Sequence, residues 1–107
     1  MIDRPGTTWR RSTFCGDSSC VEVGQPVMYG DQIQVPVHKT EHPDRIECVP
    51  VDIWRGHVQA VKSGGQVPLT IWFPAELYGN FASLFTEDEE QAFLAGVKDG
   101  QFDFATS

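Results

Sequence analysis

The stretch QIQVPVH, residues 32–38, alternates apolar and other side chains along its whole length. Ile33, Val35 and Val37 fall on one side of an extended chain, and the residues between them fall on the other. A period of two is typical of a half-buried β-strand. Because proline has no backbone N–H to donate, Pro36 predicts that this strand lies at a sheet edge.

Short apolar runs on both sides of this stretch predict further strands. Residues 20–23 and 27–29 precede it, and Gly30-Asp31 marks the turn that leads into it. The polar stretch 39–45 reads as a loop, and residues 46–49 read as another strand. The first half of the chain therefore predicts a small antiparallel sheet, because neighbouring strands joined by short turns pair in that direction.

After residue 50 the apolar period changes from two to about 3.6. In VDIWRGHVQAVKSGG, residues 51–65, the side chains of Trp54, Val58 and Val61 fall at positions i, i+4 and i+7. This spacing predicts a helix with one apolar stripe. Gly64-Gly65 is expected to end it, since glycine is favoured just after a helix C-terminus.

The last third of the chain predicts one more strand and two more helices. Residues 67–73, VPLTIWF, read as a strand, and Pro74 opens a helix that runs to about Leu84. Thr86 and Glu89 match a capping box, which opens a helix that ends at Gly100. The expected fold class is α+β: an antiparallel, curled or barrel-like sheet packed with two or three C-terminal helices.

Two segments of the chain resemble each other in kind. Residues 50–54 match 74–78, and residues 58–64 match 94–100. We interpret this as a partial internal duplication of a strand–helix unit.

The length predicts one domain over residues 1–107. Within it, residues 1–66 would form a core unit and residues 67–107 a second, partly duplicated strand–helix unit.

The charge of the chain limits its partners. The net charge is −7 with only eight Lys and Arg, and Arg10-Arg11 is the one basic cluster, so direct binding to nucleic acid is not expected. No apolar run approaches the roughly 18 residues that span a bilayer. The N-terminal residues 1–11 lack the apolar core of a secretory signal, which predicts a cytoplasmic protein.

Aromatic side chains are numerous, and most are expected in the core. Those left exposed would anchor a protein partner. Leu77, Phe81 and Leu84-Phe85 form a second apolar stripe, and acidic residues follow directly after it. An acidic rim around an apolar face could dock a basic partner. The expected partner-binding residues, which come from the two helices that begin after Pro50 and Pro74, are Trp54, His57, Leu77, Tyr78, Phe81 and Phe85.

Cysteine and histidine leave two further possibilities open. Cys15, Cys20, His38 and His42 could form a zinc site, although the spacing between the two pairs is unusual. A Cys15–Cys20 disulfide is possible if the loop doubles back, but a reducing cytoplasm opposes it. The favoured interpretation is that Cys20 is a buried apolar residue and that both thiols are free.

No pattern in the chain predicts catalysis. No nucleophile elbow and no glycine-rich phosphate loop is present, and the carboxylates of residues 87–90 suit a helix N-terminus. We therefore expect no enzyme activity and no cofactor.

The two ends of the chain carry a recognisable pattern. Residues 9–14, WRRSTF, followed by a Gly/Ser loop and residues 20–23, CVEV, resemble the start of the actinobacterial family called domain of unknown function 397. Residues 93–103, FLAGVKDGQFD, resemble its C-terminal tail, and residues 74–76, PAE, its helix start. Cys15 stands where that family has serine.

This resemblance implies a small, non-enzymatic regulator. Its members resemble partners of helix-turn-helix transcription factors and the developmental regulators of the Streptomyces BldB type, which dimerise. The expected function is therefore binding to such a factor, with modulation of transcription or development, and self-association into a homodimer. Two alternatives remain: a toxin- or antitoxin-like partner protein, and a small zinc-binding module.

Overall fold

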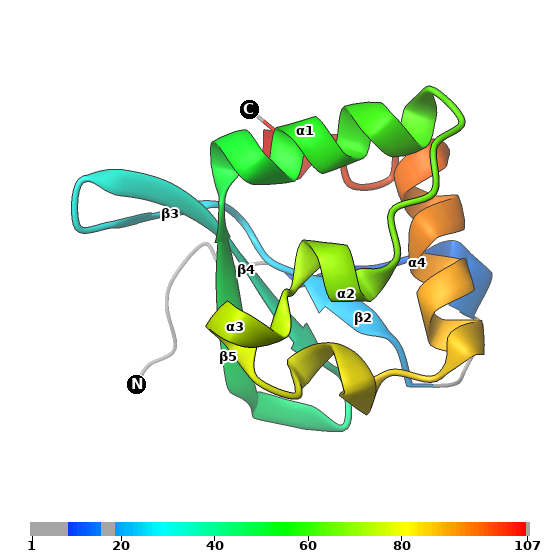
Figure 1. Ribbon diagram of the computed structural model, residues 1–107, viewed down its shortest axis with the longest axis horizontal. Coiled ribbons are helices and arrows are strands. Elements are labelled where there is room, and N and C mark those ends of the chain that lie inside the picture. The colour runs from blue at the N-terminus through cyan, green and yellow to red at the C-terminus, as the bar shows by residue number, and fades with distance from the viewer. Residues whose placement is uncertain (1–8, 16–18, 107) are drawn as a thin grey trace.

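The computed structural model describes residues 9–15 and 19–106 (Figure 1). The expectation that the N-terminus is not a secretory signal rests largely on residues 1–8, which lie outside the described residues. The Gly/Ser loop at residues 16–18 lies outside them as well.

The described residues form an open, antiparallel, five-stranded sheet. The strands are β1 (Arg10–Arg11), β2 (Val21–Val23), β3 (Val27–Tyr29), β4 (Gln32–Lys39) and β5 (His42–Pro50). β4 is the central strand, since β2 and β3 pair in turn along one of its edges and β5 pairs along the other. The predicted antiparallel sheet is confirmed.

The prediction that Pro36 marks an edge strand is wrong. Pro36 lies in the middle of the central strand β4, opposite Cys48 of β5. On its other side it faces the break between β2 and β3, where its carbonyl accepts a hydrogen bond of 2.9 Å from the N–H of Gly24. A central strand tolerates this proline because its missing N–H coincides with a gap between two partner strands.

The loop predicted at residues 39–45 is much shorter than expected. β4 continues to Lys39 and β5 begins at His42, so that Thr40 and Glu41 alone form the turn. Lys39 pairs with His42 across it. Polar composition suggested a loop, but polar residues suit the start of β5, where residues 42–44 are exposed.

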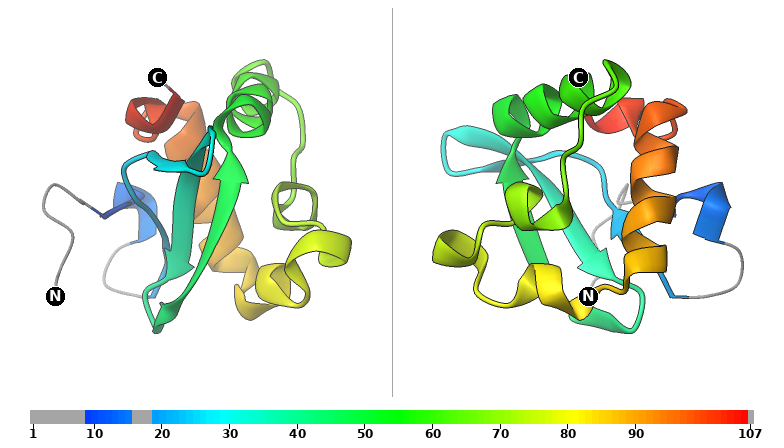
Figure 2. Two further views of the ribbon diagram at one scale, coloured as in Figure 1. Left: turned by 90° about the vertical axis from the view of Figure 1, so that its left-hand side faces the viewer. Right: turned by 45° about the vertical axis from the view of Figure 1, so that its right-hand side comes forward.

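Four α-helices lie within the described residues: α1 (Val51–Lys62), α2 (Leu69–Trp72), α3 (Ala75–Tyr78) and α4 (Glu87–Lys98). Short 3₁₀ helices accompany them: η1 (Thr13–Cys15) between β1 and β2, η2 (Phe81–Leu84) between α3 and α4, and η3 (Asp103–Thr106) after α4. Figure 2 shows α1, α2 and α3 on one side of the sheet, with η1 on the opposite side. The α+β class is therefore confirmed.

The two long helices match their predictions. Trp54, Val58 and Val61 are the buried residues of α1, and Gly64 follows the helix with a φ of 93°. That positive φ needs glycine at the helix end. α4 begins with the predicted capping box, in which the Thr86 and Glu89 side chains each bond to the other's backbone N–H.

The strand predicted at residues 67–73 is wrong, because Leu69–Trp72 form the short helix α2. Leu69 and Trp72 are buried and lie three residues apart, which is a helical spacing. The helix predicted from Pro74 to Leu84 is interrupted at Gly79, whose φ is 63°. The second half of the proposed duplication therefore has no strand to match β5.

One hydrophobic core joins the two expected units. Trp54 of α1, Trp72 of α2 and Phe93 of α4 are buried, with the Trp54 and Trp72 ring centroids 4.8 Å apart and those of Trp72 and Phe93 5.0 Å apart. Edge-to-face pairs of this kind add to the stability from burial alone. Because residues of both units share this core, they cannot be separated without exposing it.

Candidate functional site

The four residues considered for zinc do not form a metal site. Cys15 and Cys20 are joined in a disulfide, with their Cα atoms 6.2 Å apart, and this corrects the expectation of free thiols. The Nε2 atom of His38 lies 2.7 Å from a carboxylate oxygen of Glu22, whereas His42 is exposed at the start of β5. Among the described residues, no group of three or more potential ligands could hold a metal ion.

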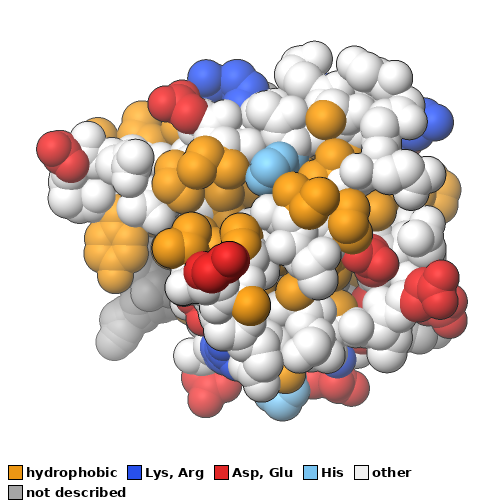
Figure 3. Space-filling model, in the orientation of Figure 1, with side chains coloured by type: hydrophobic (Ala, Val, Ile, Leu, Met, Phe, Trp, Pro, Cys, Tyr) orange, Lys and Arg blue, Asp and Glu red, His pale blue; other side chains and the backbone are white. Residues whose placement is uncertain are grey.

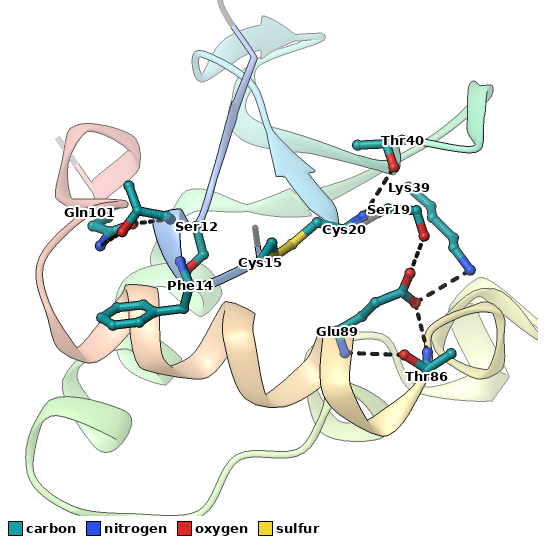
Figure 4. The surroundings of a disulfide bond; sticks show 11 residues. Ser12, Phe14, Cys15, Ser19, Cys20, Lys39, Thr40, Thr86, Glu89 and Gln101 are labelled. Carbon is teal, nitrogen blue, oxygen red and sulfur yellow. Dashed lines mark hydrogen bonds and ion pairs between the residues drawn. A yellow bond between two sulfur atoms is a disulfide. The ribbon is translucent and has the colours of Figure 1, made fainter. Parts of the chain in front are cut away.

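The disulfide joins the end of η1 to the residue before β2 (Figure 4). The N–H of Cys20 donates a hydrogen bond of 3.0 Å to the hydroxyl of Thr40. The Ser19 hydroxyl beside it donates to the carboxylate of Glu89, at the first turn of α4. These contacts fix Cys20 to the β4–β5 turn and to the start of α4.

Glu89 is the centre of this polar cluster. Its carboxylate lies 3.3 Å from Nζ of Lys39, and both side chains are more than nine-tenths buried. Burial alone would raise the pKa of Glu89. The hydrogen bonds from Ser19 and Thr86 and the charge of Lys39 outweigh that effect, so the pKa is lowered. Glu89 is therefore a buried anion that joins the segment before β2, the end of β4 and the start of α4.

An open groove lies between η1 and α4, which we call the η1–α4 groove. Its volume is about 670 Å³, and Cys15 and the exposed ring of Phe14 line its η1 side. Asp88, Gln91 and Ala95 line its α4 side. The groove is thus accessible, partly acidic and bordered by one half of the disulfide.

The two sequence segments that carry the family resemblance touch each other. Ser12 packs against α4 at Gly96, where an added Cβ would lie 2.8 Å from the Ser12 Oγ. The N–H of Thr13 donates to the side chain of Gln101, and the Gln101 side-chain amide donates back to the Thr13 hydroxyl, both at 2.9 Å. These motif residues have a structural role, since their hydrogen bonds and packing hold the N-terminal segment against the end of α4.

Two of the expected partner-binding residues belong to the core. Trp54 and Phe81 are completely buried, so they cannot serve as surface anchors in this fold, which corrects that expectation. The Tyr78 hydroxyl donates a hydrogen bond of 2.7 Å to the backbone carbonyl of Cys48. Phe85 is half-buried, and Nζ of Lys39 lies 5.8 Å from its ring centroid.

His57 and Leu77 lie at the surface of the layer that α1, α2 and α3 form. The His57 ring packs against Trp72 with 5.0 Å between centroids, and partial burial lowers its pKa. Leu77 is 75% exposed on α3. The sequence analysis missed two more exposed apolar residues in this layer, Ile53 of α1 and Ile71 of α2.

We call Ile53, His57, Ile71 and Leu77 the helical face. Figure 3 shows hydrophobic side chains gathered over this side of the molecule. Ile53 could have been found by its position, because it lies outside the stripe of Trp54, Val58 and Val61. Ile71 had no such signal, since Phe73, the other neighbour of the buried Trp72, is itself buried.

A second apolar surface covers the β3–β4 hairpin. Val27, Met28 and Tyr29 are exposed along β3, and Ile33 is exposed on β4. A hollow of about 330 Å³ lies beside them, lined by Trp9, Val27, Met28, Tyr29, Pro36, Ile46 and Cys48. We call these exposed residues of β3 and β4 the hairpin face.

Comparison of the chain with protein-family models, curated proteins and solved structures finds no match. Among the described residues no helix is long and apolar enough to cross a membrane.

Proposed function

We propose that this chain is a non-enzymatic regulator that binds a helix-turn-helix transcription factor in the cytoplasm and modulates transcription or development. The observation that carries the proposal is the helical face. Ile53, Ile71 and Leu77 are about half or more exposed, on three helices that lie on one side of the sheet. Exposed apolar side chains grouped on one face are typical of a protein-binding surface.

Charge supports a DNA-binding protein as the partner. The chain has a net charge of −7, whereas proteins that bind the phosphate backbone carry basic surfaces. Opposite net charges speed the encounter and orient it. The same charge opposes direct binding of this chain to DNA, so its effect on transcription would pass through the partner. The resemblance of residues 9–14 and 93–103 to regulators of this kind supports the same partner class.

We also propose that the chain forms a homodimer through the hairpin face. Met28 is 66% exposed and Tyr29 63% exposed, and both stand beside the apolar hollow that Trp9, Pro36 and Ile46 help to line. A projecting apolar strand next to an apolar hollow is self-complementary, which a two-fold interface requires. This surface is separate from the helical face, so a dimer would leave both partner sites open.

Capture of partners from native lysate tests the regulatory proposal. Tagged wild-type protein is expected to retain a helix-turn-helix protein, and the double variant Ile53→Lys/Leu77→Lys is expected to lose it. Phe14→Lys is the matched control, because it changes an exposed apolar residue in the η1–α4 groove and should retain the partner. Capture of a toxin-like protein, or equal capture by all three proteins, would contradict the proposal.

Sedimentation analysis tests the dimer. The wild-type protein is expected to sediment as a dimer and Met28→Lys as a monomer, with Leu77→Lys unchanged. A wild-type monomer over the micromolar range, or a dimer that Met28→Lys leaves intact, would contradict the hairpin-face assignment.

A further inference from the structure

The two sulfurs of the disulfide differ in accessibility. Cys15 is partly exposed and lines the η1–α4 groove, whereas Cys20 is completely buried. Figure 4 shows Cys15 at the end of η1 and Cys20 on the side of the sheet, next to Thr40. A reagent in the groove therefore meets Cys15 and not Cys20.

We propose that the Cys15–Cys20 disulfide is a thiol–disulfide exchange site in the native protein, with Cys15 as the sulfur that is attacked. A small thiolate in the groove forms a bond to Sγ of Cys15, the Cys15–Cys20 bond breaks, and Cys20 leaves as a thiolate that takes up a proton. The thiolate of a second small thiol then attacks the small thiol's own sulfur in the mixed disulfide, and Cys15 leaves as a thiolate that takes up a proton. The products are the two cysteine thiols and the oxidised disulfide of the small thiol.

The fold around the site keeps its shape during this cycle. η1 is held on α4 by the two hydrogen bonds between Thr13 and Gln101 and by the packing of Ser12 against Gly96. Cys20 is held by the Thr40 hydroxyl. Because these contacts do not involve sulfur, reduction leaves both thiols close together, and the bond can form again.

The groove selects among small thiols by charge. Asp88 and Glu89 line it, and Glu87 stands in the same first turn of α4, whereas the Glu90 carboxylate accepts a hydrogen bond from the N–H of Leu69 on α2. Lys39 is paired with Glu89 and Glu41. An anionic thiol is repelled by this turn, so the class of thiol that reacts best is neutral or cationic.

The disulfide also bears on the compartment. Structural disulfides are rare in a reducing cytoplasm, and those found there are mostly transient or redox-sensing. An accessible bond that exchanges with small thiols fits the proposed cytoplasmic location. The inference does not depend on which protein the helical face binds.

The test uses the full chain carrying Cys48→Ser. Cys48 is the free cysteine of the chain, and burial, followed by the charge of Glu47, raises the pKa of its thiol. The folded protein is treated with cysteamine or with mercaptoethanesulfonate, quenched with acid and mapped by mass spectrometry. We expect the mixed disulfide to form on Cys15. The rate constant of this reaction, expressed per thiolate, should be higher for cysteamine than for mercaptoethanesulfonate, and the difference should shrink as salt is added. A mixed disulfide on Cys20, or a faster reaction with the sulfonate, would overturn the proposal.

Single variants give a second readout. With Cys48→Ser in both, Cys20→Ser leaves Cys15 free and Cys15→Ser leaves Cys20 free. Cystamine is expected to modify Cys15 at least about tenfold faster than Cys20, because only Cys15 faces the groove. Circular dichroism checks that both variants are folded. Equal rates, or reduction of the native disulfide only at the rate of global unfolding, would contradict exchange in the native state.

Discussion

Replacing Gly96 by alanine tests the packing of the N-terminal segment against α4. Gly96 lies within α4, where alanine is the better helix former by at most about 1 kcal/mol. An added Cβ would lie 2.8 Å from Oγ and 2.9 Å from Cβ of Ser12, and 2.9 Å from a ring carbon of Phe102. Both neighbours are buried and have little room to move. Overpacking of this kind costs about 1–3 kcal/mol.

The steric cost is therefore expected to exceed the helical gain, and Gly96→Ala should destabilise the protein by about 1 kcal/mol. Gly56 is the matched control, since it lies in the middle of α1 and an added Cβ would meet nothing within 4 Å. Gly56→Ala should stabilise by up to about 1 kcal/mol. The same substitution thus has opposite signs at two helical positions.

Thermal and urea unfolding measure the difference. At roughly 4 °C per kcal/mol for a domain of this size, the two variants should differ by about 8 °C in Tm. Ser12→Gly removes two of the three close atoms, so it should recover part of the loss in a Gly96→Ala background. Equal stabilisation by both alanine variants would refute the packing of the N-terminal segment on α4.

Three further predictions concern the core, the disulfide and pH. Trp54→Ala should cost about 3–5 kcal/mol because the ring is completely buried, whereas the neighbouring Ile53→Ala should cost less than about 1 kcal/mol; urea unfolding distinguishes them, and similar costs would place Trp54 at the surface. The disulfide closes a sequence separation of only 5, so Cys15→Ser/Cys20→Ser should lose about 2 kcal/mol more under oxidising conditions than under full reduction, where only the burial of a serine hydroxyl at position 20 is costly; equal losses in both conditions would show that the disulfide does not stabilise the fold. The pKa of Glu89 is lowered in the folded protein, so the stability that its charge contributes is present above its ordinary pKa of about 4.3 and is lost as pH falls through the lowered value. The gap in unfolding free energy between wild type and Glu89→Gln should therefore narrow from pH 6 to pH 3, and a constant gap would contradict the Lys39 and Ser19 contacts.

The sequence predicted best those elements whose signals are local. The stripe of Trp54, Val58 and Val61 and the capping box of Thr86 and Glu89 each depend on residues within two turns of one helix. Such predictions are reliable because the spacing of the apolar residues and the residues at the helix ends indicate the same helix.

The errors came from features that depend on distant contacts. The helix at residues 69–72 is too short to show a helical period, and its apolar residues looked like a strand. Pro36 was placed at an edge because the break between β2 and β3 that accommodates it lies in another part of the chain. The burial of Trp54 and Phe81 likewise depends on the packing of separate elements, so the sequence could supply the aromatic residues but not their exposure.

Site-specific photo-crosslinking tests most directly our proposal that the helical face binds a transcription factor. A photoreactive amino acid is placed at Leu77 in one protein and at Phe14 in another, since both positions are exposed and lie on different surfaces. After irradiation in native cells, we predict a crosslink from position 77 to a helix-turn-helix protein and none to that protein from position 14. A crosslink from position 14 alone, or from neither position, would contradict it.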